Sequence, residues 1–493
     1  MNGRGDQVSL PLRHPGSNPY MVARGVGRWP AGIIRDISMA AASDGLATNL
    51  NLSKFGQATE LKKRLWFTLG ALIVFRMLSY VPLPGIDPTQ LGLLANQTQG
   101  GVLDFFNTFS GGALTRMSVV ALGVMPYITA SIVVQLATSL SPQLAAIKKE
   151  GESGRKKLNQ YTRYGTVALT AIQGYTIAVG LEAFGASAGA QAVIEPGMTF
   201  RVAAVISLIG GTMFLMWLGE QITSRGIGNG ISLIIMAGIV AHLPTTLLQL
   251  FEGSRSGTMN PLTLIGIIVA VAGLVLFICF MERAQRRILI QYPKRQTARG
   301  VQADRSHLPL KINTAGVIPP IFASSLLLMP VTITQFAGQA TAGESRWGDF
   351  IITLNQYLAH GQPLYMLLYG AGIVFFSFFY TAIVFNPEET ADNLKRYGGF
   401  IPGIRPGKNT ENYFDYVLTR ITVIGAAYLV IICLLPEYLV SALSIPFYLG
   451  GTSLLIVVNV TMDTVTQIQS HLLAHQYGDL IKKAKLKGGR LRG

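Results

Sequence analysis

Ten apolar stretches cross the chain, and polar connections of very different lengths separate them. Each stretch is close to the roughly 20 residues with which a helix crosses the hydrocarbon of a bilayer. The pattern therefore predicts an all-α, polytopic membrane protein with ten transmembrane helices. The predicted spans are residues 65–82, 118–138, 163–182, 202–219, 231–250, 262–281, 315–334, 364–385, 418–435 and 446–467.

Helix-breaking residues interrupt several spans, for example Gly123 and Pro126 in the second. Backbone groups freed by such breaks find no partner in lipid, so these helices are expected to pack against neighbours or to line a cavity. The segment 103–114 is amphiphilic, broken by glycine and too short to cross, which indicates a re-entrant or interfacial element. The long connection 282–314 follows the sixth span, and spans one to five and spans six to ten form two equal halves. If the two halves are related, an odd number of spans makes them inverted relative to each other.

The basic residues are distributed very unevenly between the two sides of the membrane. From Lys54 onward, 30 Lys and Arg residues lie in alternate connections and the C-terminal tail. The opposite connections hold only Arg116, Arg201, Arg255 and Arg346. The positive-inside rule therefore places both termini and the basic connections in the cytoplasm.

Composition agrees with this assignment. The mean hydropathy is +0.41 and 13% of the residues are charged, whereas globular proteins average about 25% charged residues. The net charge of +16 lies mostly on the cytoplasmic face, where it can contact anionic lipids. An acidic protein or an RNA is a second possible partner of this face.

The same pattern divides the chain into segments. Residues 1–50 combine arginine with glycine and proline, without an apolar run long enough for a signal peptide, and are expected to be disordered. The further segments are an N-terminal half that includes the sixth span (51–281), a basic cytoplasmic loop (282–314), the C-terminal spans (315–468) with a second cytoplasmic loop (386–417), and a basic tail (469–493).

Little in the sequence indicates enzyme, metal or cofactor chemistry. The span centres hold almost no ionisable residues, since Glu220 and Asp463 lie near cytoplasmic ends, and this argues against an ion-coupled transporter. Protease and Walker A motifs are missing from the sequence, and the glycine-rich segment 226–230 is expected to be a tight turn. Cys279 and Cys433 are expected to be packing residues. An uncharged interior can still form a hydrophobic constriction that excludes water and ions and admits a wider, extended object.

Eight stretches resemble the SecY/Sec61-alpha family, whose bacterial members form the channel subunit of the Sec protein translocase. The similarity covers roughly residues 55 to 487 in order, and because many independent stretches agree it is specific. The stretches are LGVMPYITASI (122–132), IKKEGESGRKK (147–157), QYTRYG (160–165), TMFLMWLGEQITSRGIGNGIS (212–232), HLPLKINTAGVIPPIFASS (307–325), FNPEETADNLK (385–395), PGIRPG (402–407) and FYLGGTSLLIVV (447–458).

This resemblance implies ten helices in two inverted halves of five around an hourglass pore, closed by a plug helix. It also implies a channel that is not an enzyme. Such a channel translocates unfolded secretory proteins across the bacterial inner membrane and inserts membrane proteins laterally, driven by an ATPase motor or the ribosome. The implied partners are the subunits SecE and SecG, the SecA motor, the ribosome, signal peptides and nascent membrane segments, with an accessory insertase and SecD/SecF as further candidates.

Site residues carry over from the family by motif. The pore ring is expected at Val124, Ile128, Ile231, Ile235, Ile321 and Ile456. The plug includes Phe105, Phe106, Asn107, Gly111 and Gly112, where the two glycines can act as a hinge. The lateral gate between the second and seventh helices includes Thr129, Ser131, Gln135, Ser324 and Ser325, which could form polar contacts across it. The docking residues for ribosome and motor are Lys294, Arg295, Arg299, Arg405 and Lys408.

The chain departs from the family in two regions. Asn459 and Thr461 interrupt the tenth span where aliphatic residues are usual, and they are expected to face a partner helix. Residues 1–38 have no family counterpart, which favours Met39 as the native start. Two alternative functions remain: a secondary transporter for a small solute, and a scaffold or insertase without a pore.

Overall fold

The fold is described from a computed structural model. It describes residues 59–87, 110–188, 193–257, 260–292, 295–297, 300–302, 305–327, 357, 362–443 and 450–489. All of these belong to one compact unit, Thr59–Gly493. The segment 1–50, the start hypothesis at Met39 and the plug residues Phe105, Phe106 and Asn107 lie outside the described residues.

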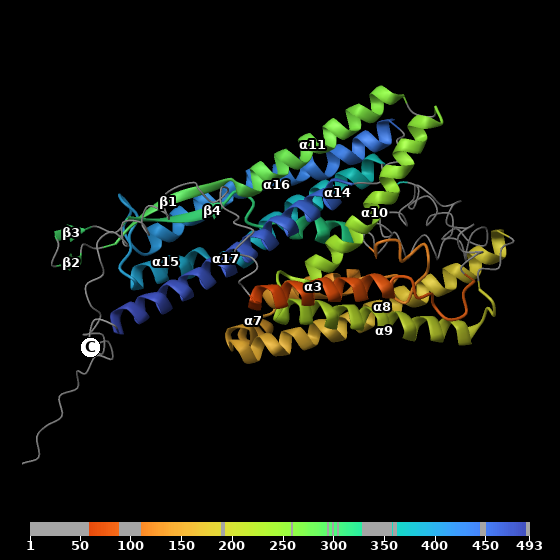
Figure 1. The fold of residues 1–493 in the computed structure, drawn as a ribbon, viewed down its shortest axis with the longest axis horizontal. Helices are drawn as coiled ribbons and strands as arrows, with labels where there is room; N and C mark the ends of the chain where they lie inside the picture. The colour runs from red at the N-terminus through yellow and green to blue at the C-terminus, as the bar shows by residue number, and fades with distance from the viewer. Residues whose placement is uncertain are drawn as a thin grey trace, which may run out of the picture. The chain divides into compact units, whose positions relative to one another are not determined.

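The first half of the unit is a helical bundle (Figure 1). Its helices are α3 (Thr59–Leu78), α6 (Met125–Leu140), α7 (Pro142–Lys149), α8 (Glu152–Ala188), α9 (Met198–Arg225) and α10 (Gly230–Arg255). Helix α8 packs along α9 and against α6. Helix α6 begins later than the predicted residue 118, because Gly123 adopts a φ of +56° and Pro126 occupies the first turn.

The second half contributes the remaining helices. They are α11 (Pro261–Arg283), an apolar helical segment Ile318–Leu327, α14 (Pro363–Val384), α15 (Pro387–Arg396), α16 (Lys408–Leu443) and α17 (Gly451–Gly489). Helix α16 packs against both α14 and α17, and α17 also contacts α10 and α11. At Gly451, an added Cβ would collide with the carbonyl oxygen of Ile432, so glycine allows α17 to approach α16 closely.

Each of the ten predicted spans overlaps a helix of the described residues. Five of these helices qualify as membrane spans by length and apolar composition alone: α9, α10, α11, α14 continued by α15, and α16. The pair α6 and α7, bent by 101°, would be a sixth span. Helix α3 falls short because Lys62, Lys63 and Arg64 lie in its first half, and the segment Ile318–Leu327 is too short. The protein is therefore a multi-pass membrane protein.

The loop 282–314, which was predicted to be cytoplasmic, contains an antiparallel β-ribbon that the sequence pattern did not predict. Its strands are β1 (Gln285–Gln291), β2 (Arg295–Thr297), β3 (Gly300–Gln302) and β4 (Arg305–Lys311). β1 pairs with β4 and β2 with β3. Ile288 and Ile290 are buried on one face of β1, as the two-residue period of a strand requires. Pro309 is tolerated in β4 because each strand of the β1–β4 pair has an open edge.

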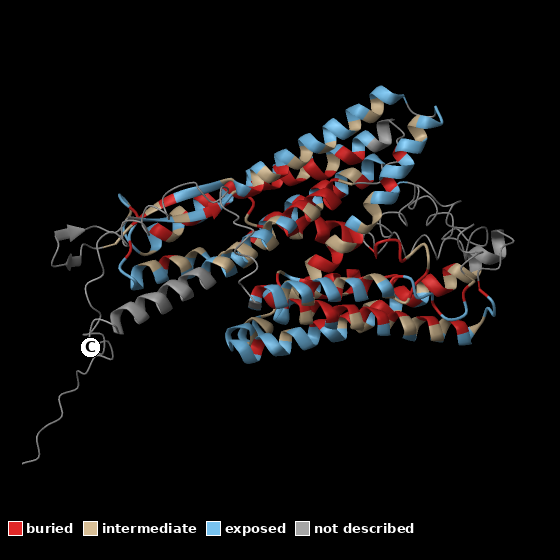
Figure 2. Cartoon of the chain, viewed as in Figure 1, coloured by how far each residue is buried: buried red, intermediate tan, exposed pale blue. Residues whose placement is uncertain are grey.

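Most buried apolar side chains of the described residues fall into three clusters. Figure 2 shows all buried residues in red. The largest draws on helices of both halves, including α3, α6, α10, α14, α16 and α17. A second cluster joins the segment after α3 to α8 and α9. The third lies between the β1–β4 ribbon, α15 and the start of α16. The predicted packing residue Cys433 is buried in the largest cluster, and Cys279 packs against it.

Candidate functional site

The structure brings all six residues predicted for a pore ring together in the largest cluster. Val124, Ile128, Ile235, Ile321 and Ile456 are buried in it, and Ile231 packs against it. They come from four separate segments: the start of α6, the start of α10, the segment 318–327 and α17. A constriction lined by aliphatic side chains holds back water and ions, because it offers them no polar partner.

The turn between α9 and α10 determines where the α10 part of the ring begins. The side chain of Asn229 caps α10 by accepting a hydrogen bond of 3.2 Å from the N–H of Ile231. The N–H of Gly228 donates to Oε1 of Gln467 on α17 at 2.8 Å. The predicted tight turn is therefore confirmed, and it also ties α10 to α17. Gln467 was not predicted, because a polar residue late in a span does not indicate its partner.

Of the predicted plug residues, the structure describes Gly111 and Gly112. Both are buried, with φ angles of +70° and +83°, which lie in the left-handed region that glycine adopts readily. The chain continues from here to α6 through turns. A hinge at this position stays a prediction, but the backbone has the conformation that requires glycine.

The polar residues predicted at the lateral gate form hydrogen bonds within their own helices. Thr129 donates to the carbonyl of Met125 at 3.1 Å, and Gln135 donates to Ser131 at 3.3 Å. Ser324 and Ser325 both donate to the carbonyl of Ile321, at 2.9 and 2.7 Å. Polar contacts across the gate are therefore not observed for these residues in this structure. A hydroxyl in a helix readily reaches the carbonyl one turn back, and this local partner takes the place of a distant one.

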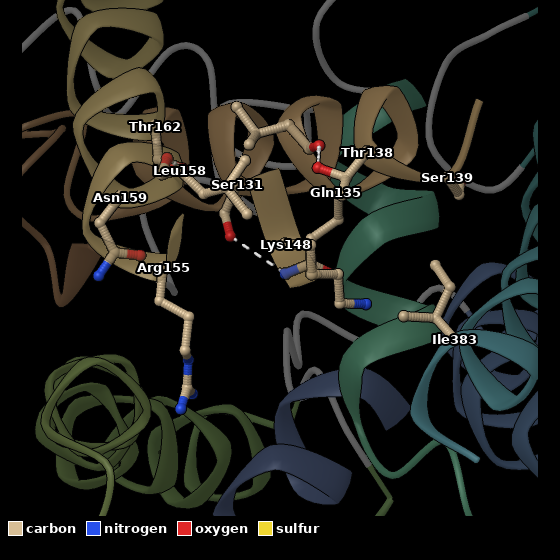
Figure 3. A pocket seen from close by; sticks show the side chains of 11 residues that line it. Ser131, Gln135, Thr138, Ser139, Lys148, Arg155, Leu158, Asn159, Thr162 and Ile383 are labelled. Atoms are coloured by element: carbon tan, nitrogen blue, oxygen red, sulfur yellow. Dashed lines mark hydrogen bonds between the residues drawn. The ribbon is translucent and has the colours of Figure 1, made fainter. Parts of the chain in front are cut away.

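Two of the gate residues, Ser131 and Gln135, line a cavity of about 220 Å³ (Figure 3). Lys148 of α7 and Arg155 of α8 contribute to its wall, and Ile383 of α14 lies on the opposite side. The cavity is thus bounded by α6, α7 and α8 of the first half and by α14 of the second. It leaves open space beside the polar face of α6.

The two loops predicted to be cytoplasmic, 282–314 and 386–417, pack into one body, referred to here as the docking body. Its buried residues come from the ribbon, α15, the following turn and α16: Ile288, Leu310, Ala391, Ile401, Phe414, Val417, Leu418 and Ile421. The backbones of Gln291 and Phe400 also exchange two hydrogen bonds of 2.9 Å. Arg295 begins strand β2, while Lys294 and Arg299 lie outside the described residues. The sequence showed two separate loops, and only the fold shows that they are joined.

Arg405 is exposed in the turn that precedes α16. Gly403 and Gly407 on either side have φ angles of +83° and +111°, which a residue with a side chain rarely adopts. The carbonyl of Arg405 accepts a hydrogen bond of 3.1 Å from Oγ1 of Thr410. Lys408 is exposed just after this turn, where α16 begins. The turn therefore holds both cations outward on the docking body.

A buried carboxylate at the root of the ribbon was missed by the sequence analysis. Glu282, near the end of α11, is 7% exposed and Asn313 is 4% exposed. Nδ2 of Asn313 donates to Oε1 of Glu282 at 2.6 Å, and its side chain also exchanges hydrogen bonds with the backbone of Gly316. The pair therefore joins α11 to the chain that leads into the segment 318–327. An acidic residue at the end of a span looks like an ordinary helix terminus, so its burial could not be predicted from the sequence.

The polar residues of the tenth span lie on α17. Thr461 donates to the carbonyl of Val457 at 2.6 Å and contacts Sδ of Met236 on α10 at 3.6 Å. Asn459 is buried in the same helix. The expectation that this polar face meets a neighbouring helix is confirmed for Thr461.

Comparison with known proteins agrees with this geometry. The SecY family model matches residues 118–465. The protein translocase subunit SecY of Escherichia coli (strain K12) is 55% identical over 434 residues, which cover 88% of this chain and 96% of the relative. The corresponding subunit of Rickettsia bellii is 51% identical over 440 residues, covering 89% of this chain and all of the relative. The chain belongs to the SecY family.

Solved structures with the SecY fold resemble the described bundle. One, titled the structure of a protein conducting channel, superposes with a TM-score of 0.58 at 17% identity and covers 83% of this chain and 92% of its own. Sec61 in the canine ribosome–channel complex from the endoplasmic reticulum has a TM-score of 0.56 at 16% identity, with the same coverage. The predicted all-α, polytopic channel fold is therefore confirmed. The individual SecY site residues stay predictions.

Proposed function

We propose that the chain is the central subunit of a protein-conducting channel. Unfolded secretory proteins cross the membrane through it, and membrane proteins leave it sideways into lipid. The observation that carries this proposal is the convergence of six aliphatic residues from four helical segments in one buried cluster. The near full-length similarity to relatives named protein translocase subunit SecY supports the same activity.

The ring acts as a seal that a passing chain can displace. Ile128, Ile321 and Ile456 are 8%, 8% and 1% exposed. Burying an isoleucine side chain stabilises its position by about 1.5–3 kcal/mol, so the ring closes without an ion pair or a metal. An extended polypeptide that enters the ring can replace these contacts with contacts of its own. The channel is therefore closed by apolar packing, which does not select a particular substrate sequence.

The lateral gate lies between α6 and the segment 318–327. The hydroxyls of Thr129, Ser324 and Ser325 are satisfied within their own helices. Separating the two helices therefore breaks none of these hydrogen bonds, and the cost is limited to apolar contacts that lipid or a signal peptide can replace. The cavity beside Ser131 and Gln135 supports the same location for the opening.

The energy for transport comes from partners that bind the docking body. We assign Arg405 and Lys408, together with Lys294, Arg295 and Arg299, to contacts with the ribosome or the SecA motor, since cations on stiff loops neutralise phosphates and carboxylates. Two solved relatives are ribosome-bound: canine Sec61 and the yeast Ssh1 complex. SecE and SecG complete the channel, and anionic lipids contact its basic face. The chain itself performs no catalysis.

The topology follows the charge distribution. We place the protein in the bacterial inner membrane, with both termini, the loops 282–314 and 386–417 and the tail 469–493 in the cytoplasm. The segments 51–281 and 315–468, which carry the ten spans, enclose the pore. This arrangement exposes the docking body to the ribosome and leaves the plug segment on the outer side.

Conductance measurements test the proposal. The complex with SecE and SecG is reconstituted in planar bilayers, intact and with residues 103–112 deleted. We expect the intact complex to be closed and the deletion variant to open to a large, unselective conductance. A scaffold without a pore would carry no current in either form.

A further inference from the structure

Two arginines and a tyrosine form a cluster around the end of the predicted plug segment. Nη1 of Arg76, on α3, donates to the carbonyl oxygen of Gly111 at 2.6 Å. Arg116 donates from Nε to the carbonyl of Gly112 at 3.0 Å and from Nη2 to that of Gly111 at 3.3 Å. Two guanidinium groups from different parts of the chain therefore converge on two consecutive carbonyls. The sealing and docking roles proposed above do not use this arrangement.

The ring of Tyr80 allows the two like charges to lie close together. The guanidinium carbons of Arg76 and Arg116 lie 5.0 and 4.1 Å from the ring centroid, within the range of cation–π attraction. Nη2 of Arg76 also donates to the tyrosine hydroxyl at 3.1 Å. Both cations are half-buried, while Tyr80 is 57% exposed. Water can therefore reach one side of the cluster.

The glycines make this approach possible. An added Cβ at Gly111 would lie 3.1 Å from Cα of Gly238 on α10 and 3.2 Å from Nη1 of Arg76. At Gly112 it would lie 2.5 Å from Nη2 of Arg116. Any side chain would push the turn away from both α10 and the arginines. Gly238 follows the ring residue Ile235 by about one helical turn, so the clamped turn is seated against the ring-bearing helix.

We propose that Arg76 and Arg116 form a latch that holds the Gly111–Gly112 turn against α10 until a substrate enters. The inference rests on the proposed channel function. Within the described residues both guanidiniums contact only neutral groups. Water can replace the two carbonyls when the turn is released. The two arginines are positioning residues, and the strength of their hold determines how good a signal sequence must be to open the channel.

The latch is tested on the whole complex reconstituted with SecE and SecG. Arg76→Gln and Arg116→Gln remove the positive charge and the planar guanidinium with its several donors, and leave a neutral amide. Arg255→Gln changes an exposed arginine at the end of α10 and is the matched control. The readouts are the current without substrate and the transport of a reporter with a defective signal sequence. Because a hydrogen bond to a charged group is typically stronger than 1.4 kcal/mol, each latch variant is expected to raise the resting open fraction tenfold or more. The control is expected to match the wild type.

A second comparison separates the latch from a general loss of stability. Deleting residues 103–112 removes what the latch holds, so adding Arg116→Gln to the deletion should raise the current no further. Arg116→Lys keeps the positive charge but lacks the planar guanidinium that donates to both carbonyls. Its current without substrate should therefore lie between those of the wild type and Arg116→Gln. If an arginine variant fails to assemble, Tyr80→Leu tests the same cluster by loosening both cations.

The outcomes distinguish the latch from the channel itself. If the deletion opens the channel and the arginine variants, in assembled complexes, stay as closed as Arg255→Gln, the latch is refuted and the channel stands. If Arg116→Gln adds to the deletion, the arginine acts elsewhere and the latch is also refuted. If neither the deletion nor a substrate-loaded complex conducts, the proposed channel fails.

Discussion

Replacing Asn313 with alanine removes the group that pairs the buried carboxylate of Glu282. The 2.6 Å hydrogen bond between them joins α11 to the chain that leads into the segment 318–327, the predicted side of the lateral gate. The same asparagine closes the turn at Gly316 through two further hydrogen bonds of 3.0 and 3.1 Å. Alanine deletes all three and leaves a carboxylate that is 7% exposed without this donor.

The expected cost follows from these contacts. A hydrogen bond to a charged group contributes about 1.5–3 kcal/mol and a neutral one about 0.5–1.5 kcal/mol. Water entering the opened site recovers part of the loss, so we expect the root of the ribbon to be destabilised by about 3 kcal/mol. At 1.4 kcal/mol per factor of ten, local opening should increase roughly a hundredfold.

Trypsin digestion of the purified complex measures this opening, because the β1–β4 ribbon carries several Arg and Lys residues. Asn313→Ala should be cut much faster within the ribbon and should unfold at a lower temperature. Asn409→Ala, at an exposed position in the same cytoplasmic region, is the matched control. Glu282→Gln keeps an acceptor oxygen and should cost less than about 1 kcal/mol.

The double variant Glu282→Leu/Asn313→Ala tests the reason for the effect. Removing both partners leaves no unpaired buried charge, so the double variant should be more stable than Asn313→Ala alone. If Asn313→Ala and the Asn409→Ala control are cleaved at the same rate, the pair does not anchor the ribbon, and the reasoning fails.

Two further substitutions test the packing of the pore. Ile321→Asn should weaken the seal by about 2–3 kcal/mol and admit substrates with defective signal sequences. Ile321→Leu should keep wild-type selectivity. If Ile321→Asn is as selective as the wild type in export assays, Ile321 does not belong to the ring. Gly451→Val should push α17 away from the Ile432 carbonyl and lower the stability of the complex by about 1–3 kcal/mol. Gly266→Val, where an added Cβ meets open space, should leave the thermal midpoint unchanged; equal shifts for both glycines would contradict the close-packing argument.

The spans could be predicted from the sequence because lipid imposes a length and an apolar composition on each helix. The predicted helix ends were less accurate where a glycine with a positive φ or a proline sets the start of a helix. Gly123 before α6 and Pro126 in its first turn are examples. The ring could not be predicted from pattern alone, since Ile128 and Ile321 look like any core aliphatic residues. Only the family resemblance selected them, and the structure then placed them in one cluster.

The contacts that hold the fold together were not predictable for a different reason. Glu282 meets Asn313 across 31 residues, and Arg76 meets Gly111 across 35. A local pattern carries no information about such pairs. The ribbon was missed because basic residues hid its alternating face, on which Ile288 and Ile290 of β1 and Leu310 of β4 are the buried residues among those whose burial is described. Each missed feature is a polar or mixed segment whose conformation depends on a partner elsewhere.

Crosslinking of a chain caught in transit tests the channel most directly. Cys279 and Cys433 are replaced with alanine, and single cysteines are placed at Ile128 and Ile321, with Ile268 on the exposed face of α11 as the control. A secretory protein carrying one cysteine is arrested midway through proteoliposomes that contain the complex. We expect it to crosslink at positions 128 and 321 but not at 268, and Arg405→Glu to abolish both crosslinks when the motor drives transport. Transport without any crosslink at 128 or 321 would show that the chain does not pass through this ring.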